Sequence, residues 1–169
     1  MAADGPIWGQ MGADGKREGS MERATFLTGE FRHTVDDRGR VAIPVRFRPR
    51  MAHGATVARW LDGCLGVFPR DAWDSLAERM ADLPTTSTTA REFVRFMASG
   101  AVDVDLDGQG RILLPAYLRE YGELSGGEVV VVGALSRLEL WAPARWDSYR
   151  RKLEDAPEEI AERLQELGL

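Results

Sequence analysis

Hydrophobic and polar residues follow each other along the chain in two similar rounds of strand-like and helix-like patterns. Each round predicts a strand, a tight turn, a second strand, a short helix, two further strands joined by a turn, and a longer helix. The β-rich runs are TVARWLDGCLGVF at 56–68 and VVVVGALSRLELW at 129–141, and a helix pattern containing Trp-Asp-Ser follows each. The pattern therefore predicts a tandem repeat, with units near 26–82 and 97–153.

The clearest sign of the repeat is a segment that occurs twice, as VDDRGRVAIP at 35–44 and LDGQGRILLP at 106–115. Asp107 stands 71 positions after Asp36, and the glycine, arginine and proline that follow keep the same spacing. Glycine permits the positive φ of a tight turn, and aspartate accepts hydrogen bonds from the backbone beyond it. Proline suits the first turn of a helix, so each segment predicts a hairpin that leads into a short helix.

Shorter patterns predict turns, caps and helix faces. LDGC at 61–64 is an Asp-Gly hairpin turn. PTTSTT at 84–89 predicts a polar linker, and Thr89 with Glu92 predicts a capping box at the start of the next helix. Apolar residues three or four positions apart predict a buried helix face at Trp73, Leu76, Met80 and Leu83, and an amphipathic tail helix at Ile160, Leu164 and Leu167.

The large aromatic residues fit a folded core. We expect Trp60, Trp73, Trp141 and Trp146 to be core or interface anchors and Cys64 to be a small buried residue. Four short strands bury too little surface to be stable alone, whereas two copies can pair into one sheet. We therefore predict a mainly β, α+β fold with short helices, in which the two repeats form one pseudo-symmetric β barrel.

Charge is distributed unevenly along the chain, whose net charge is −5. Residues 154–169 hold six acidic residues and one arginine, which also gives −5. Residues 29–50 hold six arginines and three acidic residues, or +3, whereas residues 100–123 hold two arginines and five acidic residues, or −3. These sums predict that the first repeat faces a polyanion and that the second mainly completes the barrel.

Several function classes find no support in the sequence. No apolar run reaches the roughly 20 residues that cross a bilayer, so we expect no membrane partner. Cys64 is the one cysteine, which excludes an intrachain disulfide and favours a reducing cytoplasm. One cysteine and two scattered histidines, His33 and His53, predict no metal site. No phosphate-binding loop or nucleophile with an evident base is present, so we expect no enzyme activity, cofactor or small-molecule substrate.

A resemblance to a known family rests on the two turns and their surroundings. The stretches TGEFRHTVDDRGRVAIPVRFR, LDGCLGVFP, DGQGRILLPAYLREYGEL and LELWAPARWD resemble the MraZ family of bacterial transcriptional regulators, over about 26–153. The resemblance implies two tandem SpoVT-AbrB repeats that form a swapped-hairpin barrel. It also implies a ring-shaped homo-oligomer that binds double-stranded DNA at short G-rich direct repeats, upstream of the division and cell-wall gene cluster that includes its own gene.

On this basis the chain divides into five segments. They are a disordered N-terminal extension (1–25), the first repeat (26–83), a linker and helix start (84–96), the second repeat (97–153) and an acidic tail (154–169). Met1, Met11 and Met21 all remain candidate start codons. The resemblance implies a cytoplasmic, nucleoid-associated protein.

The candidate DNA-binding residues gather at the first turn. The resemblance assigns the DNA contact to Arg40, with Asp36 as its motif partner, and an aspartate four residues from an arginine can hold the guanidinium for a bidentate acceptor such as guanine. The second motif maps onto Asp107, Gly110 and Arg111, although the uncharged Gln109 stands where the first has Arg38. The other candidates are Gly39 and the basic residues Arg32, His33, Arg38, Arg46 and Arg48.

Alternative interpretations stay open at the level of sequence. Each turn can be a plain hairpin with a solvated arginine, although this does not explain an arginine directly after the glycine in both copies. Arg46 and Arg48 can lie on a solvated helix face, and His33 can be an ordinary strand residue. AbrB-like domains also occur in antitoxins, so a protein-interaction role is the alternative function, which co-purification of a small toxin would favour.

Overall fold

The computed structural model describes residues 26–168, and the predicted N-terminal extension with its candidate start codons lies outside this part. The first repeat provides β1 (Leu27–Val35), β2 (Arg40–Ala42), the 3-10 helix η1 (Val45–Met51), β3 (Ala55–Arg59), β4 (Leu65–Pro69), α1 (Arg70–Ala81) and α2 (Thr88–Ala98). The second provides β5 (Val102–Val104), β6 (Arg111–Leu113), α3 (Ala116–Gly122), β7 (Gly127–Leu135), β8 (Leu138–Trp141), α4 (Pro143–Asp155) and α5 (Pro157–Gln165).

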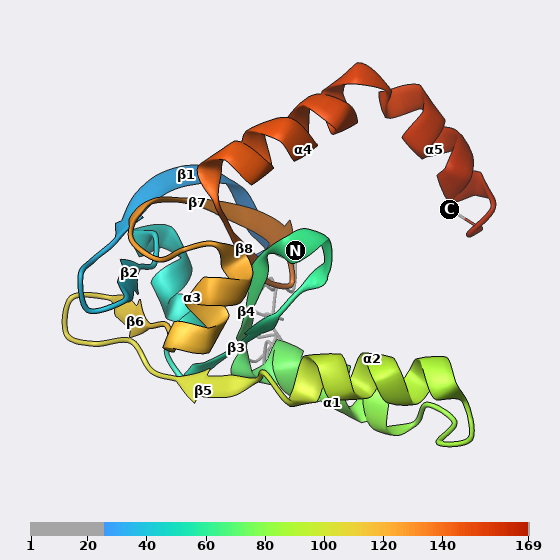
Figure 1. Ribbon diagram of the computed structural model, residues 1–169, viewed down its shortest axis with the longest axis horizontal. Helices are drawn as coiled ribbons and strands as arrows, with labels where there is room; N and C mark the ends of the chain where they lie inside the picture. The colour runs from blue at the N-terminus through green and yellow to red at the C-terminus, as the bar shows by residue number, and fades with distance from the viewer. Residues whose placement is uncertain (1–25, 169) are drawn as a thin grey trace, which may run out of the picture.

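All eight strands form one antiparallel sheet, in the order β5-β3-β4-β8-β7-β1-β2-β6 (Figure 1). The two repeats exchange strands, because β1 pairs along its whole length with β7, from Leu27 opposite Leu135 to Val35 opposite Gly127, and β3 pairs with β5. The edge strands β5 and β6 follow each other in the chain, so the sheet curls into a nearly closed barrel. The predicted α+β barrel built from two repeats is confirmed.

The core fills the inside of this barrel with aliphatic side chains. Side chains alternate between the two faces of a strand, so β2 and β6 each send one residue inward, Val41 and Ile112, and both are buried. The helices η1 and α3 each cover part of the barrel with buried apolar residues, among them Phe47 and Leu118. The outward residues of β2 and β6 are left for the surface, where the candidate site lies.

Two smaller aromatic clusters flank the core. Helices α1 and α2 pack on β3 and β4 through Phe68, Met80 and Met97, with Trp60 and Trp73 half-buried beside them. Trp141 and Trp146 are buried on the same outer face of the sheet, in a cluster with Cys64 and Tyr149 that also contacts Trp60. The expectations that the four tryptophans are core or interface anchors and that Cys64 is buried are confirmed, with Trp60 and Trp73 only half-buried.

Two local predictions are wrong in detail. Helix α2 begins after Ser87, whose hydroxyl accepts a hydrogen bond from the backbone N–H of Ala90, so the cap is Ser87 and not Thr89. Helix α1 ends at Ala81, and Leu83 lies beyond it with 37% of its surface exposed, so Leu83 does not extend the buried face. The Asp-Gly turn is present, because Asp62 and Gly63 both have positive φ and the backbone N–H of Trp60 donates to the carbonyl of Cys64.

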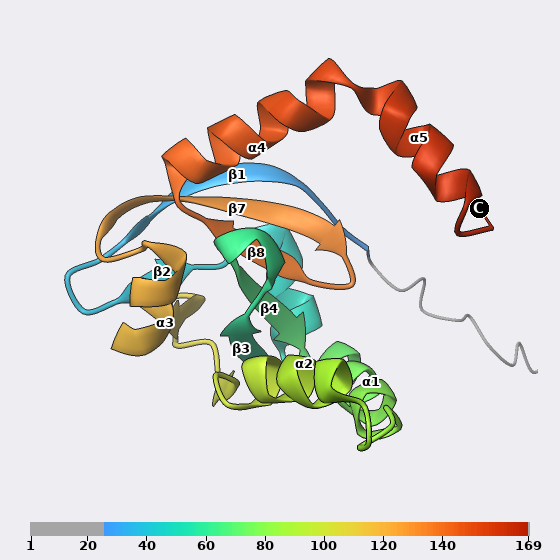
Figure 2. The ribbon, with the colours of Figure 1, turned by 45° about the vertical axis from the view of Figure 1, so that its right-hand side comes forward.

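The C-terminal helices leave the barrel as an arm. Helix α4 packs its first half on β7, and α5 then continues at an angle, clear of the sheet (Figure 2). Helices α1 and α2 lie on the opposite side of the barrel in both views (Figures 1 and 2). The predicted amphipathic tail helix is therefore present as α5.

Candidate nucleic-acid interface

The first turn is organised by the carboxylate of Asp36. One of its oxygens accepts hydrogen bonds from the backbone N–H groups of Arg38, at 3.0 Å, and Arg40, at 2.9 Å. The other oxygen accepts a hydrogen bond from Nε of Arg40 at 2.8 Å. The predicted pairing of aspartate and arginine across the turn is thus present, and it fixes the direction of the guanidinium.

The second turn repeats this arrangement atom for atom. Asp107 accepts from the backbone N–H groups of Gln109 and Arg111, both at 2.9 Å, and from Nε of Arg111 at 2.8 Å. Gln109 stands where the first turn has Arg38, and each of them donates only its backbone N–H to the turn aspartate. The uncharged side chain of Gln109 therefore does not alter the geometry of the second turn. Each turn therefore holds one arginine in the same way.

Strand pairing brings the two turns onto one surface. In the β2–β6 ladder Arg40 lies opposite Leu113 and Ala42 lies opposite Arg111, with Val41 opposite Ile112 at the centre. Residues directly opposite each other in an antiparallel pair share a face. Because Val41 and Ile112 point into the barrel, Arg40 and Arg111 both point outward.

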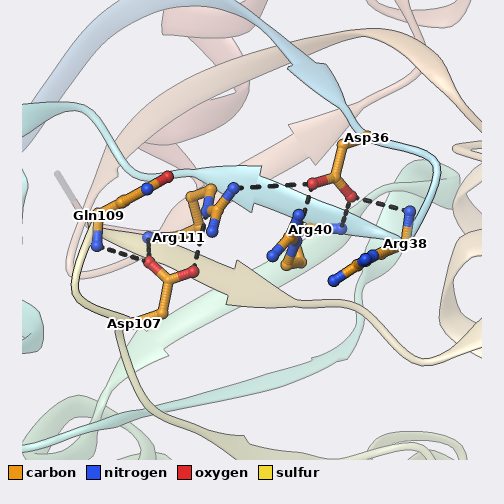
Figure 3. Close-up of polar contacts among 6 residues, drawn as sticks. All are labelled: Asp36, Arg38, Arg40, Asp107, Gln109 and Arg111. Carbon is orange, nitrogen blue, oxygen red and sulfur yellow. Dashed lines mark hydrogen bonds and ion pairs between the residues drawn. The ribbon is translucent and has the colours of Figure 1, made fainter.

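The two arginines lie close together between the two aspartates (Figure 3). An Nη atom of Arg111 is 3.9 Å from the carboxylate of Asp36, so the second repeat contacts the first turn directly. Leu113 lies on the same outward face and is 57% exposed. The surface thus presents two oriented guanidinium groups and one apolar side chain, and below we call Arg40, Arg111 and Leu113 the twin-turn surface.

Each turn glycine is held by the opposite repeat. The carbonyl of Gly39 accepts from the backbone N–H of Leu114 at 2.8 Å, and the carbonyl of Gly110 accepts from the backbone N–H of Ile43 at 2.9 Å. Both glycines are buried and have positive φ, +79° and +74°. These bonds cross between the repeats, so neither turn is set by its own repeat alone.

Two arginines of the short helices complete this cross-bracing. Nε of Arg48 donates to the carbonyl of Ile43, and its guanidinium covers Gly110 so closely that a Cβ there would clash. In the other repeat, Nε of Arg119 donates to the carbonyl of Leu114, and its guanidinium covers Gly39 in the same way. Arg48 therefore supports the second turn, and Arg119 supports the first.

Hydrogen bonds to the carboxylates stabilise their charged form. The backbone N–H of Arg40 is the main cause that lowers the pKa of Asp36, helped by the Arg40 guanidinium and the N–H of Arg38. The N–H groups of Arg111 and Gln109, with the Arg111 guanidinium, lower the pKa of Asp107 in the same way. Both aspartates are thus ionised at neutral pH.

The other predicted residues do not all join this surface. Arg38 is exposed beside the first turn. Arg32 is held by Glu128 and Asp147, each at 2.9 Å, which neutralise it. His33 is half-buried on the core-facing side of β1, and the Arg46 guanidinium lies 4.8 Å from the Phe47 ring and bonds Thr28, near the far end of that strand.

Two of the five acidic residues counted in the second repeat, Asp103 and Glu123, have partners away from the turn. Asp103 bonds Thr56 and Arg70, and Glu123 pairs with Arg145. Their charge therefore does not bear on the twin-turn surface. The structure places Arg111 of the second repeat on the same surface as Arg40, and the expectation that the first repeat faces DNA while the second mainly completes the barrel stays a prediction.

Neither a membrane-spanning helix nor a metal-binding group is found within residues 26–168. No helix within 26–168 is long and apolar enough to cross a membrane. Across the same residues, His, Cys, Asp and Glu form no group of three that would hold a metal ion. The chemistry on offer at the turns is the recognition of an anion or of a hydrogen-bond acceptor pair.

Comparison with known proteins agrees with this repeat architecture. The family model described as "MraZ protein, putative antitoxin-like" matches the chain twice, over residues 26–96 and 97–167. The chain belongs to the MraZ family. Its MraZ relatives include "Transcriptional regulator MraZ" of Moorella thermoacetica, 45% identical over 139 residues, which are 82% of this chain and 96% of the relative.

A second MraZ relative, from Desulfitobacterium hafniense strain DSM 10664, has the same name and is 48% identical over 144 residues, which are 85% of this chain and all of the relative. The protein from Halothermothrix orenii, again with that name, is 44% identical over the same coverage. The names of these MraZ proteins support a role in the regulation of transcription and agree with the expectation of no enzyme activity.

Two residues that contribute to the site, Leu113 and Arg119, were not predicted from the sequence. Leu113 follows Arg111 at a spacing of two, so strand alternation alone places both on one face. Arg119 stands 71 positions after Arg48, so the repeat itself relates them. Both signals are present in the sequence, but their meaning depends on the pairing of β2 with β6.

Proposed function

We propose that this protein is a sequence-specific DNA-binding transcriptional regulator, and that Arg40 of the first turn, with Arg111 beside it, contacts the bases. The observation that carries this proposal is that two guanidinium groups are held at their Nε atoms by Asp36 and Asp107, at 2.8 Å each. Each Nε bonds the aspartate of its own turn, and the Nη atoms make no hydrogen bond to that aspartate, although one Nη of Arg111 lies 3.9 Å from the Asp36 carboxylate. A guanidinium presented in this way suits the O6 and N7 acceptors of guanine in the major groove.

Leu113 adds a contact of a different kind. Its exposed side chain lies opposite Arg40 and two residues along β6 from Arg111, on the same outward face. An apolar group at this place fits the methyl group of thymine, which arginine does not read. Two arginines and one leucine thus provide a means to distinguish base pairs, while Arg38 adds positive charge toward phosphates.

The target follows from the family resemblance. We propose that the protein binds short G-rich direct repeats upstream of its own operon in the division and cell-wall cluster, as a ring-shaped homo-oligomer. Three residues offer few contacts, so one chain would bind weakly. A ring places several twin-turn surfaces on tandem sites and raises the effective concentration at each. The protein would then act in the cytoplasm, at the nucleoid.

Fluorescence anisotropy tests the proposal directly. A labelled fragment from upstream of the gene is compared with a scrambled fragment of equal length, between about 50 and 200 mM salt, where phosphate contacts weaken steeply. We expect wild type to prefer the native fragment and Arg40→Ala to lose about 1–3 kcal/mol of binding.

The matched control is Arg150→Ala, which removes an arginine of α4 that pairs with Asp147 and Glu154. It makes the same change in net charge and should leave the preference intact. Equal binding of wild type to both fragments would refute sequence-specific recognition.

The antitoxin-like description of the family favours one second candidate, the capture of a partner protein. The same surface would then bind acidic side chains in place of DNA. A small protein that co-purifies in a fixed ratio, and that Arg40→Ala releases, would support this alternative.

A further inference from the structure

Helix α5 has an apolar face with little cover. Leu164 is 39% exposed, Leu167 just beyond the helix is 78% exposed, and Ile160 is half-buried. In Figures 1 and 2 the helix stands away from the barrel. An exposed helix with an apolar stripe gains little stability by itself, since most helical stability in proteins comes from packing.

The tandem repeat shows what the equivalent helix does in the other unit. The two family matches begin at residues 26 and 97, which aligns α2 of the first repeat with α5 of the second. Residues 82–87 let α2 fold back beside α1, where Met97 is buried. Only Ala156 separates α4 from α5, so α5 has no room to fold back in this way.

An apolar groove with a positively charged lining lies between α1 and α2. Its cavity of about 210 Å³ has an apolar lining that includes Met80, Leu83 and Val94. The charged residues in its lining are Arg91 and Arg95, and both are positive. Residues 154–169, in contrast, have a net charge of −5. An apolar stripe with acidic flanks therefore complements this groove in both polarity and charge.

We infer that α5 of one chain docks in the α1–α2 groove of a neighbouring copy. The groove of the same chain lies across the barrel from the arm, so a second copy is the occupant that the arm reaches (Figures 1 and 2). Such a contact is head-to-tail, because it joins two different surfaces, and a repeated head-to-tail contact closes into a ring when its rotation allows. The inference rests on the ring assembly of the proposed function and names its joint.

The test measures the mass of the full-length protein in solution by light scattering, without DNA. Leu164→Glu alters the arm and Leu83→Glu alters the groove, and both replace exposed residues outside the barrel core. We expect wild type to be a ring and each variant to fall to the mass of a single chain, 18.8 kDa. The matched control is Leu61→Glu, which replaces another exposed leucine, 48% accessible, and should keep the ring.

Mixing the two variants distinguishes a head-to-tail joint from other contacts. Each variant keeps the half of the joint that the other lacks, so an equal mixture should form one joint per pair and double the mass. A variant that keeps the ring, a mixture that stays monomeric, or a control that loses the ring would each overturn the inference. A monomeric wild type would overturn the ring as well. Because DNA is absent, none of these results decides the proposed DNA contact, which the Arg40→Ala experiment tests separately.

Discussion

Asp36 and Asp107 each fix the direction of an arginine, and in the proposed DNA contact they act only through these arginines. Each carboxylate accepts three hydrogen bonds, two from backbone N–H groups and one from Nε of its arginine. The guanidinium loses part of its freedom before DNA arrives, so less entropy is lost on binding. A negative charge beside the proposed DNA contact would weaken binding by itself, so its presence at both turns fits the role of positioning the arginines.

Asp36→Asn separates orientation from charge. The amide keeps a similar shape but loses the charge-assisted bond to Nε of Arg40. We expect binding to a scrambled fragment to strengthen, because the surface becomes more positive, while the preference for the native fragment falls by about tenfold, or ~1.4 kcal/mol. Anisotropy on both fragments measures the two effects, and a preference equal to that of wild type would contradict the positioning role.

The pKa of Asp36 gives this residue a defined pH dependence. Its pKa is lower in the folded protein than in the unfolded chain, so the ionised form stabilises the fold above the ordinary carboxyl pKa. That contribution is lost as the pH falls through the lower, folded value. We expect wild type to have a higher Tm than Asp36→Asn at pH 7 and the difference to vanish in acid. A difference that is unchanged at pH 2 would contradict the assignment.

At the scale of elements, the turns depend on close contact between repeats. A Cβ at Gly39 would lie 2.8 Å from Nε of Arg119 and 3.0 Å from the carbonyl of Leu114, in a backbone with φ of +79°. Gly108 lies in the second turn with no atom within 4 Å of a Cβ position. Substitution of Gly108 therefore serves as the control for substitution of Gly39, because an added Cβ meets neighbouring atoms only at Gly39.

Gly39→Ala should destabilise the protein by about 1–3 kcal/mol, because it adds backbone strain and displaces Arg119. Gly108→Ala should change the free energy of unfolding by less than about 0.5 kcal/mol. Urea denaturation measures both variants. Equal effects would mean that the cross-bracing of the first turn contributes little.

The turns and their strands could be predicted from the sequence because their signals are local. Asp36, Gly39 and Arg40 fix a hairpin through bonds within five residues, and the second copy confirms the spacing. The N-cap of α2 was harder to predict, since PTTSTT offers several capping residues of nearly equal propensity. Arg48 could not be placed from sequence, because its position over Gly110 depends on a contact between residues that are far apart in the chain.

At the scale of the whole molecule, local charge sums misrepresent the surface. Arg32 lies in the basic segment but is neutralised by Glu128 and Asp147, while Asp103 lies in an acidic segment but is paired with Arg70. Folding pairs charged residues of one repeat with those of the other, so only the three-dimensional structure shows which charges lie on the surface without an opposite partner. The barrel thereby brings two turns, from segments of opposite net charge, onto the one surface that we propose binds DNA.

The swapped strands explain why the repeat occurs twice in one chain. The β2–β6 ladder takes one strand from each repeat, and the pair of Val41 and Ile112 at its centre relates the two turns by an approximate two-fold axis. Removing either repeat would remove half of the ladder and the bonds that hold the other glycine. The doubled turn therefore serves the fold and, in the proposed function, the DNA-binding surface as well.

The most direct test of this account compares Arg40→Ala, Arg111→Ala and the double variant for anisotropy with the native upstream fragment. If the two turns form one DNA-binding surface, each single variant should lose about 1–3 kcal/mol of binding and the double variant should lose its preference for the native fragment. Wild-type binding by Arg111→Ala, with loss confined to Arg40→Ala, would contradict the shared surface and leave the first turn as the sole reader.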